Sequence, residues 1–285
     1  MKTQWKILLT LLLALALTAL GICGVYRKTH TCALPVLMYH HFAEEAPTDT
    51  VVTPDRFREQ MTALRDAGFT AVTLRQMIDY VDLGTPLPEK PVFITMDDGY
   101  TSNLTVAAPI LEELGFCATV FVIGVNEGED YYVHSGAPLS PARFSYEEAA
   151  QWVEKGVLDL QSHTFDMHQL ASYGFSGRDG VLPLPGEDDD AYAAALLADG
   201  EAFWRRREGR VDTPLVALAY PFGYYTEETD ELLGDLGFAV TFTVEERCSR
   251  LEVGERDSLR RMGRFNVTDR LSGMDLVQLL ERSLD

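Results

Sequence analysis

The stretch "VFITMDDGYTS" at residues 92–102 sets an apolar run directly against two adjacent carboxylates and a glycine. The run "VFIT" suits a buried strand, whereas Asp97 and Asp98 repel each other and are common in turns. A turn alone would explain "DDG". A further role for the two acids therefore depends on what the rest of the chain can bring beside them.

Short apolar runs recur along the chain, and amphipathic segments separate them. In "TPDRFREQMTALRDAGF", Phe57, Met61 and Leu64 fall at helical spacing, and Gly68 supplies the stop. Strand followed by helix, repeated about seven times, predicts an α/β fold, a distorted (β/α) barrel of about seven parallel strands. The expected strands lie at residues 35–38, 70–73, 91–95, 117–123, 157–161, 215–220 and 239–244.

Residues 1–30 differ from the rest of the chain. Lys2 and Lys6 precede an uncharged run at residues 7–25, and two further basic residues follow it. The run is long enough to cross a bilayer as a helix and lacks the small-residue end of a cleavage site. We expect an N-terminal transmembrane anchor, with a cleaved signal segment as the alternative, and one exported catalytic domain at residues 31–285.

The charge of the predicted exported domain excludes one class of partner. Of the 24 Lys and Arg, four lie in residues 1–30, which leaves 20 against 44 Asp and Glu, a net charge of −24. Such a surface repels nucleic acid and gains nothing from anionic lipid. The three cysteines outside residues 1–30 do not form a disulfide framework. A single disulfide between Cys32 and Cys248 is an alternative that the sequence does not decide.

Polar residues that could do chemistry follow four of the expected strands. In a parallel barrel the carboxyl ends of the strands meet on one face, where active sites are built. We therefore expect these four stretches to converge. They are His40 and His41, Asp97 and Asp98, His163 and His168, and the segment Tyr220, Pro221, Phe222 and Gly223.

The pair His163 and His168 could share a ligand only outside regular helix. Five residues apart, they would point about 140° away from each other around a helix axis. A loop after a strand removes that restriction. Two histidines and one carboxylate, with a position left for water, form the kind of shell that a catalytic zinc ion uses.

Two motifs carry a resemblance to a known family. "TMDDGYTSN" at 95–103 and "SHTFDMH" at 162–168 resemble the first two motifs of the polysaccharide deacetylases of carbohydrate esterase family 4, the NodB-homology domain. "PVLMYHHF" at 35–42 and "AYPFG" at 219–223 resemble the branch that contains the poly-β-1,6-N-acetylglucosamine deacetylases. The likeness covers about residues 34–270.

The resemblance implies a role for each matching residue. Asp98, His163 and His168 would bind a divalent metal, and Asp97 would be the base that takes a proton from the attacking water. The backbone N–H of Phe222 would stabilise the oxyanion that forms. A metal beside Asp98 would also keep the crowded Asp97 ionised.

The chain departs from the general family pattern at two places. No histidine follows His168, where the general family has one, and Arg264 stands in that region. The resemblance to the poly-N-acetylglucosamine branch implies that an N-terminal histidine is the general acid, His40 in preference to His41, because His40 matches the branch's Tyr-His pair. Ala219 replaces an arginine that orients the base elsewhere in the family. Arg264 is a candidate substitute for that arginine as well.

The sequence thus predicts a metal-dependent enzyme that hydrolyses N-acetyl groups of an N-acetylglucosamine polysaccharide. Alternatives are the same chemistry on peptidoglycan, chitin oligomers or acetylated xylan, and an inactive sugar-binding protein. Zinc is the expected cofactor, with cobalt, nickel or iron as alternatives. We expect a monomer on the outer side of the cell membrane, held by a single span, or secreted if residues 1–30 are cleaved.

Overall fold

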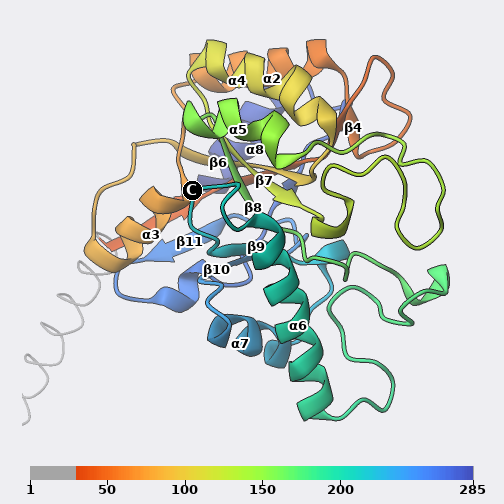
Figure 1. Cartoon of the computed structure of the whole chain (residues 1–285). Helices are drawn as coiled ribbons and strands as arrows, with labels where there is room; N and C mark the ends of the chain where they lie inside the picture. The colour runs from red at the N-terminus through yellow and green to blue at the C-terminus, as the bar shows by residue number, and fades with distance from the viewer. Residues whose placement is uncertain (1–29, 285) are drawn as a thin grey trace, which may run out of the picture.

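The computed structural model describes residues 30–284, and the predicted anchor at residues 1–30 lies outside this range except for its last residue. Within the described part, no helix is both long and apolar enough to cross a membrane. Figure 1 shows a central sheet with helices around it. The strands are β1 Thr31–Leu34, β2 Val36–Tyr39, β3 His41–Phe42, β4 Val51–Val52, β5 Thr70–Ala71, β6 Pro91–Asp98, β7 Ala118–Val122, β8 Leu158–Ser162, β9 Ala217–Ala219, β10 Val240–Phe242, β11 Ser249–Glu252 and β12 Phe265–Asn266.

The helices alternate with the strands of the main sheet, as the periodicity predicts. Thr53, Thr73 and Ser145 accept hydrogen bonds at the starts of α2, α3 and α5, so these three helices begin at a capping side chain. The α-helices are α2 Pro54–Asp66, α3 Leu74–Leu83, α4 Ala108–Leu114, α5 Tyr146–Glu154, α6 Asp189–Arg207, α7 Glu227–Asp235 and α8 Gly273–Leu284.

The main sheet is parallel and strongly curved. Its order is β10-β9-β8-β7-β6-β2-β12, and β5 pairs with β6 beside this path. Met262, just before β12, donates to the Thr241 carbonyl at 2.8 Å and accepts from the Thr243 N–H at 2.9 Å. These bonds join β10 to the segment before β12, so the sheet bends into the predicted barrel-like α/β form.

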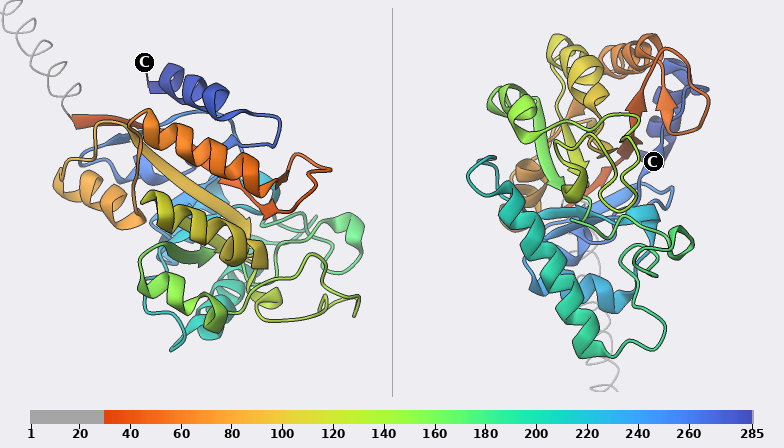
Figure 2. Two further views of the ribbon diagram at one scale, coloured as in Figure 1. Left: turned by 90° about the horizontal axis from the view of Figure 1, so that it is seen from above. Right: turned by 45° about the vertical axis from the view of Figure 1, so that its right-hand side comes forward.

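Two apolar layers hold this sheet. The inner layer includes Phe93, Phe121 and Phe242, whose rings lie 5.3 to 5.5 Å apart inside the curve. The outer layer packs the sheet against α2, α4, α5 and α8. In Figure 2, α2 and α8 lie side by side although most of the chain separates them.

Differences from the predicted elements occur where strands are short. Residues 70–73 form a strand only at Thr70–Ala71, because the Thr73 side chain already caps α3. The two-residue β12 and the antiparallel pair of β1 with β11 were not predicted. Cys32, Cys117 and Cys248 are free thiols, so the bridge left open between Cys32 and Cys248 is absent from the described residues.

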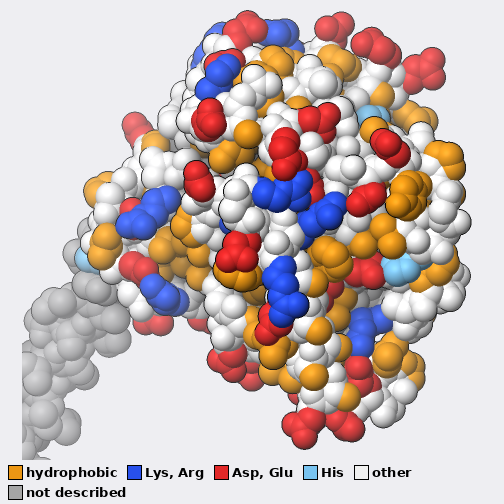
Figure 3. All heavy atoms as spheres, in the orientation of Figure 1, with side chains coloured by type: hydrophobic (Ala, Val, Ile, Leu, Met, Phe, Trp, Pro, Cys, Tyr) orange, Lys and Arg blue, Asp and Glu red, His pale blue; other side chains and the backbone are white. Residues whose placement is uncertain are grey.

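Surface charge follows the acidic composition. On the face drawn in Figure 3, the acidic side chains are scattered, and the basic side chains gather over the middle of the face, where α6 runs. Several of these bases are neutralised locally; Arg206 and Arg210, for example, both contact the buried carboxylate of Glu127. This face therefore offers no extended basic surface to a polyanion.

Candidate metal centre and active site

The carboxyl ends of four strands bring the predicted polar residues together. β2 leads to His40, β6 ends at Asp98, β8 leads to His163, and β9 leads to the turn Pro221–Gly223. β6, β7, β8 and β9 are successive neighbours in the parallel sheet, so their carboxyl ends share one face. The expected convergence is present.

Asp98, His163 and His168 form a compact cluster. One ligand atom from each lies within 4.8 Å of the others. The Nε2 atoms of His163 and His168 lie 3.5 and 3.4 Å from Oδ1 of Asp98. Residues 163–168 form no regular helix, which gives the two histidines the freedom that their five-residue spacing requires.

A hydrogen bond fixes the orientation of the His163 ring. Its Nδ1 lies 2.8 Å from the Ala219 carbonyl, which can only accept, so Nδ1 carries a proton and donates it there, and Nε2 faces Asp98. Burial lowers the pKa of His168 to about 4, so this imidazole is neutral near pH 7. Neutral imidazoles are the form in which histidine binds metal.

The carboxylate of Asp98 is the third candidate ligand for a cation. Its Oδ1 is buried and makes no hydrogen bond. Burial favours the neutral acid, yet electrostatic interactions with His168 and His163 outweigh it and hold the pKa of Asp98 below its usual range. A buried anionic oxygen without a hydrogen bond, beside two imidazole nitrogens, fits a divalent metal ion.

Backbone strain marks the same residues. Asp98 and Thr164 have φ of 74° and 68°, in the left-handed region that non-glycine residues seldom adopt. Such conformations cost free energy and persist where the surrounding structure imposes them, often at functional sites.

Asp97 lies beside the cluster and is paired with Arg264. The guanidinium forms two parallel hydrogen bonds, Nη1 to Oδ1 at 2.7 Å and Nη2 to Oδ2 at 2.8 Å. Arg264 is fully buried, and its Nε donates to the Thr243 carbonyl. The contact that the sequence suggested for Arg264 is therefore made, in a bidentate geometry that fixes the plane of the carboxylate.

This pairing also decides the ionisation of Asp97. Burial alone would raise the pKa of Asp97, but the charges of Arg264 and His163 and the two hydrogen bonds from Arg264 bring it below the ordinary value. Asp97 is therefore ionised at neutral pH and able to accept a proton. The residue that holds it in place, Arg264, follows it by 167 residues in the chain.

His40 and His41 point to different surroundings. Nδ1 of His40 is buried and makes no hydrogen bond, and the charges that act on His40 include Asp97 and Asp98. Nδ1 of His41 instead contacts the Ser102 hydroxyl at 2.9 Å. Of the two histidines, His40 is the one whose side chain faces the carboxylate pair.

Phe222 lies beside His168. It occupies the turn Pro221–Gly223 with φ of 59°, and its ring centroid lies 4.4 Å from that of His168. This left-handed backbone, directly after β9, places the Phe222 peptide beside a candidate metal ligand. Its role as an oxyanion donor remains a prediction.

Sequence reasoning missed Arg143. Its guanidinium carbon lies 3.6 Å from the centroid of the Tyr100 ring, and Nη2 is 3.8 Å from Oδ2 of Asp98. Tyr100 lies in the stretch quoted first, but Arg143 belongs to a long loop with no periodicity. Backbone bonds on both sides bring it to the site: the Phe144 N–H donates to the Gly99 carbonyl, and the Thr101 N–H donates to the Ala142 carbonyl.

A second carboxylate fixes the loop that carries the two histidines. Asp199, in α6, accepts the N–H groups of Phe165 and Asp166 at 2.8 Å each. Burial raises the pKa of Asp199 to about 6. Asp166 contacts His134 at 2.8 Å, so it supports the loop rather than orienting His163 or His168.

Comparison with known proteins agrees with this geometry. The family model described as polysaccharide deacetylase matches residues 84–241. The poly-β-1,6-N-acetyl-D-glucosamine N-deacetylase of Escherichia coli K12 is 26% identical over 73% of this chain, which spans 33% of that protein. The protein of the same name from Staphylococcus epidermidis is 24% identical over 69% of this chain and 62% of its own length.

Solved structures share the fold along most of the chain. IcaB from Ammonifex degensii is 26% identical, with a TM-score of 0.71, over 88% of this chain and 97% of that one. A de-N-acetylase from Aggregatibacter actinomycetemcomitans has a TM-score of 0.73 at 17% identity, over 87% of this chain and 99% of that one. With a family model covering more than half of its length, the chain belongs to the polysaccharide deacetylase family.

Proposed function

We propose that this protein is a metal-dependent hydrolase that removes N-acetyl groups from a β-1,6-linked N-acetylglucosamine polysaccharide outside the cytoplasm. The observation that carries the proposal is the Asp98, His163 and His168 cluster directly beside a carboxylate paired with Arg264. The names of the relatives from E. coli and S. epidermidis support the choice of polymer.

The candidate ligands are Asp98, His163 and His168. A divalent ion held there, zinc first and cobalt, nickel or iron as alternatives, would supply Lewis acidity that activates water and polarises the acetamide carbonyl. The structure offers two imidazoles and one carboxylate to such an ion, and three protein ligands leave coordination positions for water and substrate.

Asp97 is the proposed general base. Both of its oxygens bond Arg264, and the pair keeps it ionised and fixed in orientation, so it can take the proton of the attacking water without reorganising. Arg264 acts on the reaction through Asp97 and is a positioning residue.

Collapse of the tetrahedral intermediate must release an amine, and that step needs a proton donor. His40 is the proposed donor because its Nδ1 is buried without a hydrogen bond and the charges of Asp97 and Asp98 act on its side chain, with His41 as the alternative. The backbone N–H of Phe222 would stabilise the oxyanion from the side of His168.

We place the catalytic domain outside the cell, as a monomer tied to the membrane by residues 1–30, or secreted if that segment is cleaved. Support for this location comes from the apolar run at residues 7–25 and its flanking bases.

Acetate release tests the function directly. The purified full-length chain is incubated with β-1,6- and β-1,4-linked N-acetylglucosamine oligomers, with chelator, and with metal added back. Release that needs metal and is faster on the β-1,6 linkage supports the proposal. Faster release on β-1,4 oligomers would move the substrate to chitin-like polymers or peptidoglycan. No release from a metal-loaded protein, together with binding unaffected by Asp97→Asn, would favour a sugar-binding role.

A further inference from the structure

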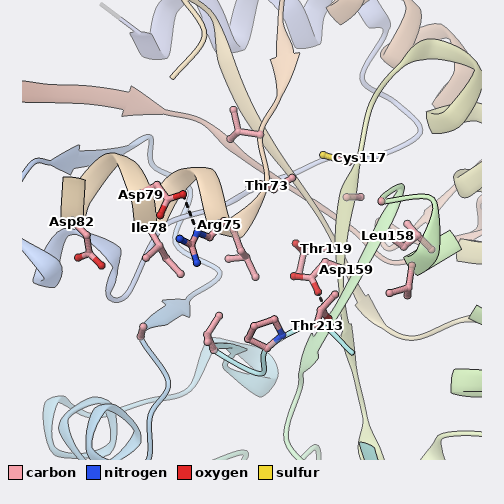
Figure 4. A pocket seen from close by; sticks show the side chains of 18 of the residues that line it. Thr73, Arg75, Ile78, Asp79, Asp82, Cys117, Thr119, Leu158, Asp159 and Thr213 are labelled. Carbon is pink, nitrogen blue, oxygen red and sulfur yellow. Dashed lines mark hydrogen bonds and ion pairs between the residues drawn. The ribbon is translucent and has the colours of Figure 1, made fainter. Parts of the chain in front are cut away.

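A cavity of about 940 Å³ opens at the end of the sheet opposite to Asp97. Residues at or just before the starts of β7, β8, β9 and β10 line one side, and α3 lines the other (Figure 4). None of the candidate metal ligands or catalytic residues borders it, so it is separate from the site described above.

Small residues at the strand starts leave this room. Ala118 begins β7, Ala239 precedes β10, and Gly156 and Gly237 border the same space. A side chain at either glycine would find no atom within 4 Å of its Cβ. The cavity therefore exists because the lining residues are too small to fill it.

Most of the wall is apolar. Volume and lining are those of pockets that bind small molecules, which combine apolar walls with a few polar groups that fix orientation. The main apolar contributors are Val72, Leu74, Ile78, Val153, Leu158 and Val216.

One carboxylate, Asp159, faces this apolar space. It lies beside Thr119 on the neighbouring strand, and Figure 4 shows both side chains at the cavity wall across from α3. The Thr213 hydroxyl donates to Oδ1 at 2.7 Å, and the Gln161 amide donates to Oδ2 at 3.0 Å. Arg207 reaches Asp159 only through the Thr213 hydroxyl.

Charge at the rim does not compensate Asp159. Arg75 is bound to Asp79 at 2.8 Å, and Arg256 is bound to Asp82 through two hydrogen bonds. The two rim arginines are thus neutralised where they stand. Of the charged side chains that line the cavity, Asp159 is the one without a bonded partner of opposite sign; the charge of Arg207 acts on it through the Thr213 hydroxyl.

We propose that this cavity is a second ligand site, which takes a compact apolar molecule bearing one ammonium group. The ammonium would donate to Asp159 and the Thr119 hydroxyl, and the apolar body would cover α3 and the strand starts. A half-buried carboxylate without a bonded cation favours a cationic partner, and the acidic surface of the domain disfavours anions.

A pair of fluorescent probes tests the proposal. Dansylcadaverine carries an apolar ring system and a primary ammonium, and the dansyl amide of pentylamine has the same body without the charge. The full-length chain should bind dansylcadaverine at one site with a blue-shifted emission, about tenfold or more tighter than the uncharged probe. Absence of saturable binding would overturn the proposal.

Three variants locate the binding. Asp159→Asn should abolish the preference for the charged probe, and Val216→Trp should fill the cavity and remove binding of both probes. Asp97→Asn, the same chemical change at the other end of the sheet, should leave binding unchanged. A charge preference that survives Asp159→Asn, or binding lost in Asp97→Asn, would place the probe elsewhere and refute the assignment.

Cys117 gives a second readout if Val216→Trp does not fold. This thiol borders the cavity, and burial raises its pKa to about 11, so it reacts slowly. In a chain whose Cys23, Cys32 and Cys248 are changed to Ser, dansylcadaverine should slow Cys117 modification several-fold at saturation. An unchanged rate at saturating probe would contradict binding in the cavity.

Discussion

The two ends of the same parallel strands are built in different ways. At the carboxyl end, the buried charges of Asp97 and Arg264 are paired, and the side chains fill the space between them. At the amino end, Asp159 has no bonded cation and borders a cavity of about 940 Å³. A catalytic site, which we propose at the carboxyl end, requires side chains held in one geometry. A ligand site, which we propose at the amino end, requires an empty volume.

Backbone strain follows the same division. Asp98, Thr164 and Phe222, three of the four non-glycine residues with positive φ in the described part of the chain, lie at the carboxyl end. At the amino end, positive φ occurs at Gly156 and Gly237, where it costs little. Most of this backbone strain thus lies at the end where we place the reaction.

Removal of the metal should have the largest effect. Chelation, or His168→Ala, should reduce acetate release to background, because the proposed Lewis acid is lost. His134→Ala is the matched control: this histidine contacts Asp166 in the same region but is outside the cluster. Metal content measured by mass spectrometry should fall only in His168→Ala; an equal fall in both would refute the ligand set.

The second-largest effect is expected when the same substitution, Asp to Asn, is made at the two ends of the sheet. Asp97→Asn should lower kcat/KM for acetate release by about 10²–10⁴, as loss of a general base does. Asp159→Asn should leave it within about twofold. Both variants should retain metal. Comparable losses in the two would mean that the ends of the sheet are not functionally separate.

His40 and His41 can be separated in the same assay. His40→Gln should reduce kcat by about 10² through loss of the amine's proton donor, while His41→Gln should cost less than about tenfold. Substrates with a better leaving group should restore activity to His40→Gln. The reverse pattern would move the role to His41.

Arg264→Met should weaken both catalysis and folding. Without the guanidinium, the pKa of the buried Asp97 rises, so the acid limb of the kcat/KM profile should shift to higher pH. The buried carboxylate left unpaired should cost about 3–5 kcal/mol in the free energy of unfolding. Arg264→Lys keeps the charge and should shift the limb less; identical profiles for the wild type and Arg264→Met would exclude a positioning role.

The smallest expected effect is on stability between pH 4 and 7. Asp199 has a pKa of about 6 when folded, above the ordinary value of 3.8, so the native state binds its proton more tightly. The stabilisation is complete below about pH 4 and is lost as the pH rises through about 6. Chemical unfolding should show a decline of about 1–3 kcal/mol over this range in the wild type, and a smaller decline in Asp199→Asn.

Sequence predicted the carboxyl end of the sheet better than the amino end. Motifs followed strands there, and parallel strands must bring their ends together, so the convergence of Asp98 and His163 could be inferred. Arg264 was named as a candidate partner of Asp97, but only the bridge between β10 and the segment before β12 shows how it enters the barrel. Arg143 could not be predicted in this way, because it lies in a loop and not at the end of a strand.

The cavity could not have been predicted, because its volume depends on how side chains from separate elements fail to fill a common space. Ala118, Gly156 and Ala239 are unremarkable in the sequence, and none of them signals an opening. Two-residue strands such as β12 are similarly hidden, since they are too short for any periodicity to show.

The link between Asp97 and Arg264 has a consequence for the order in which the protein is made. The proposed base and all three candidate ligands leave the ribosome before Arg264, which follows Asp97 by 167 residues. Until those last residues emerge and join β10 to β12, Asp97 has no fixed orientation. A partly synthesised chain, or one clipped before Arg264, would carry the metal ligands but not the oriented base, so its hydrolysis would be slower than that of the chain with Arg264 in place.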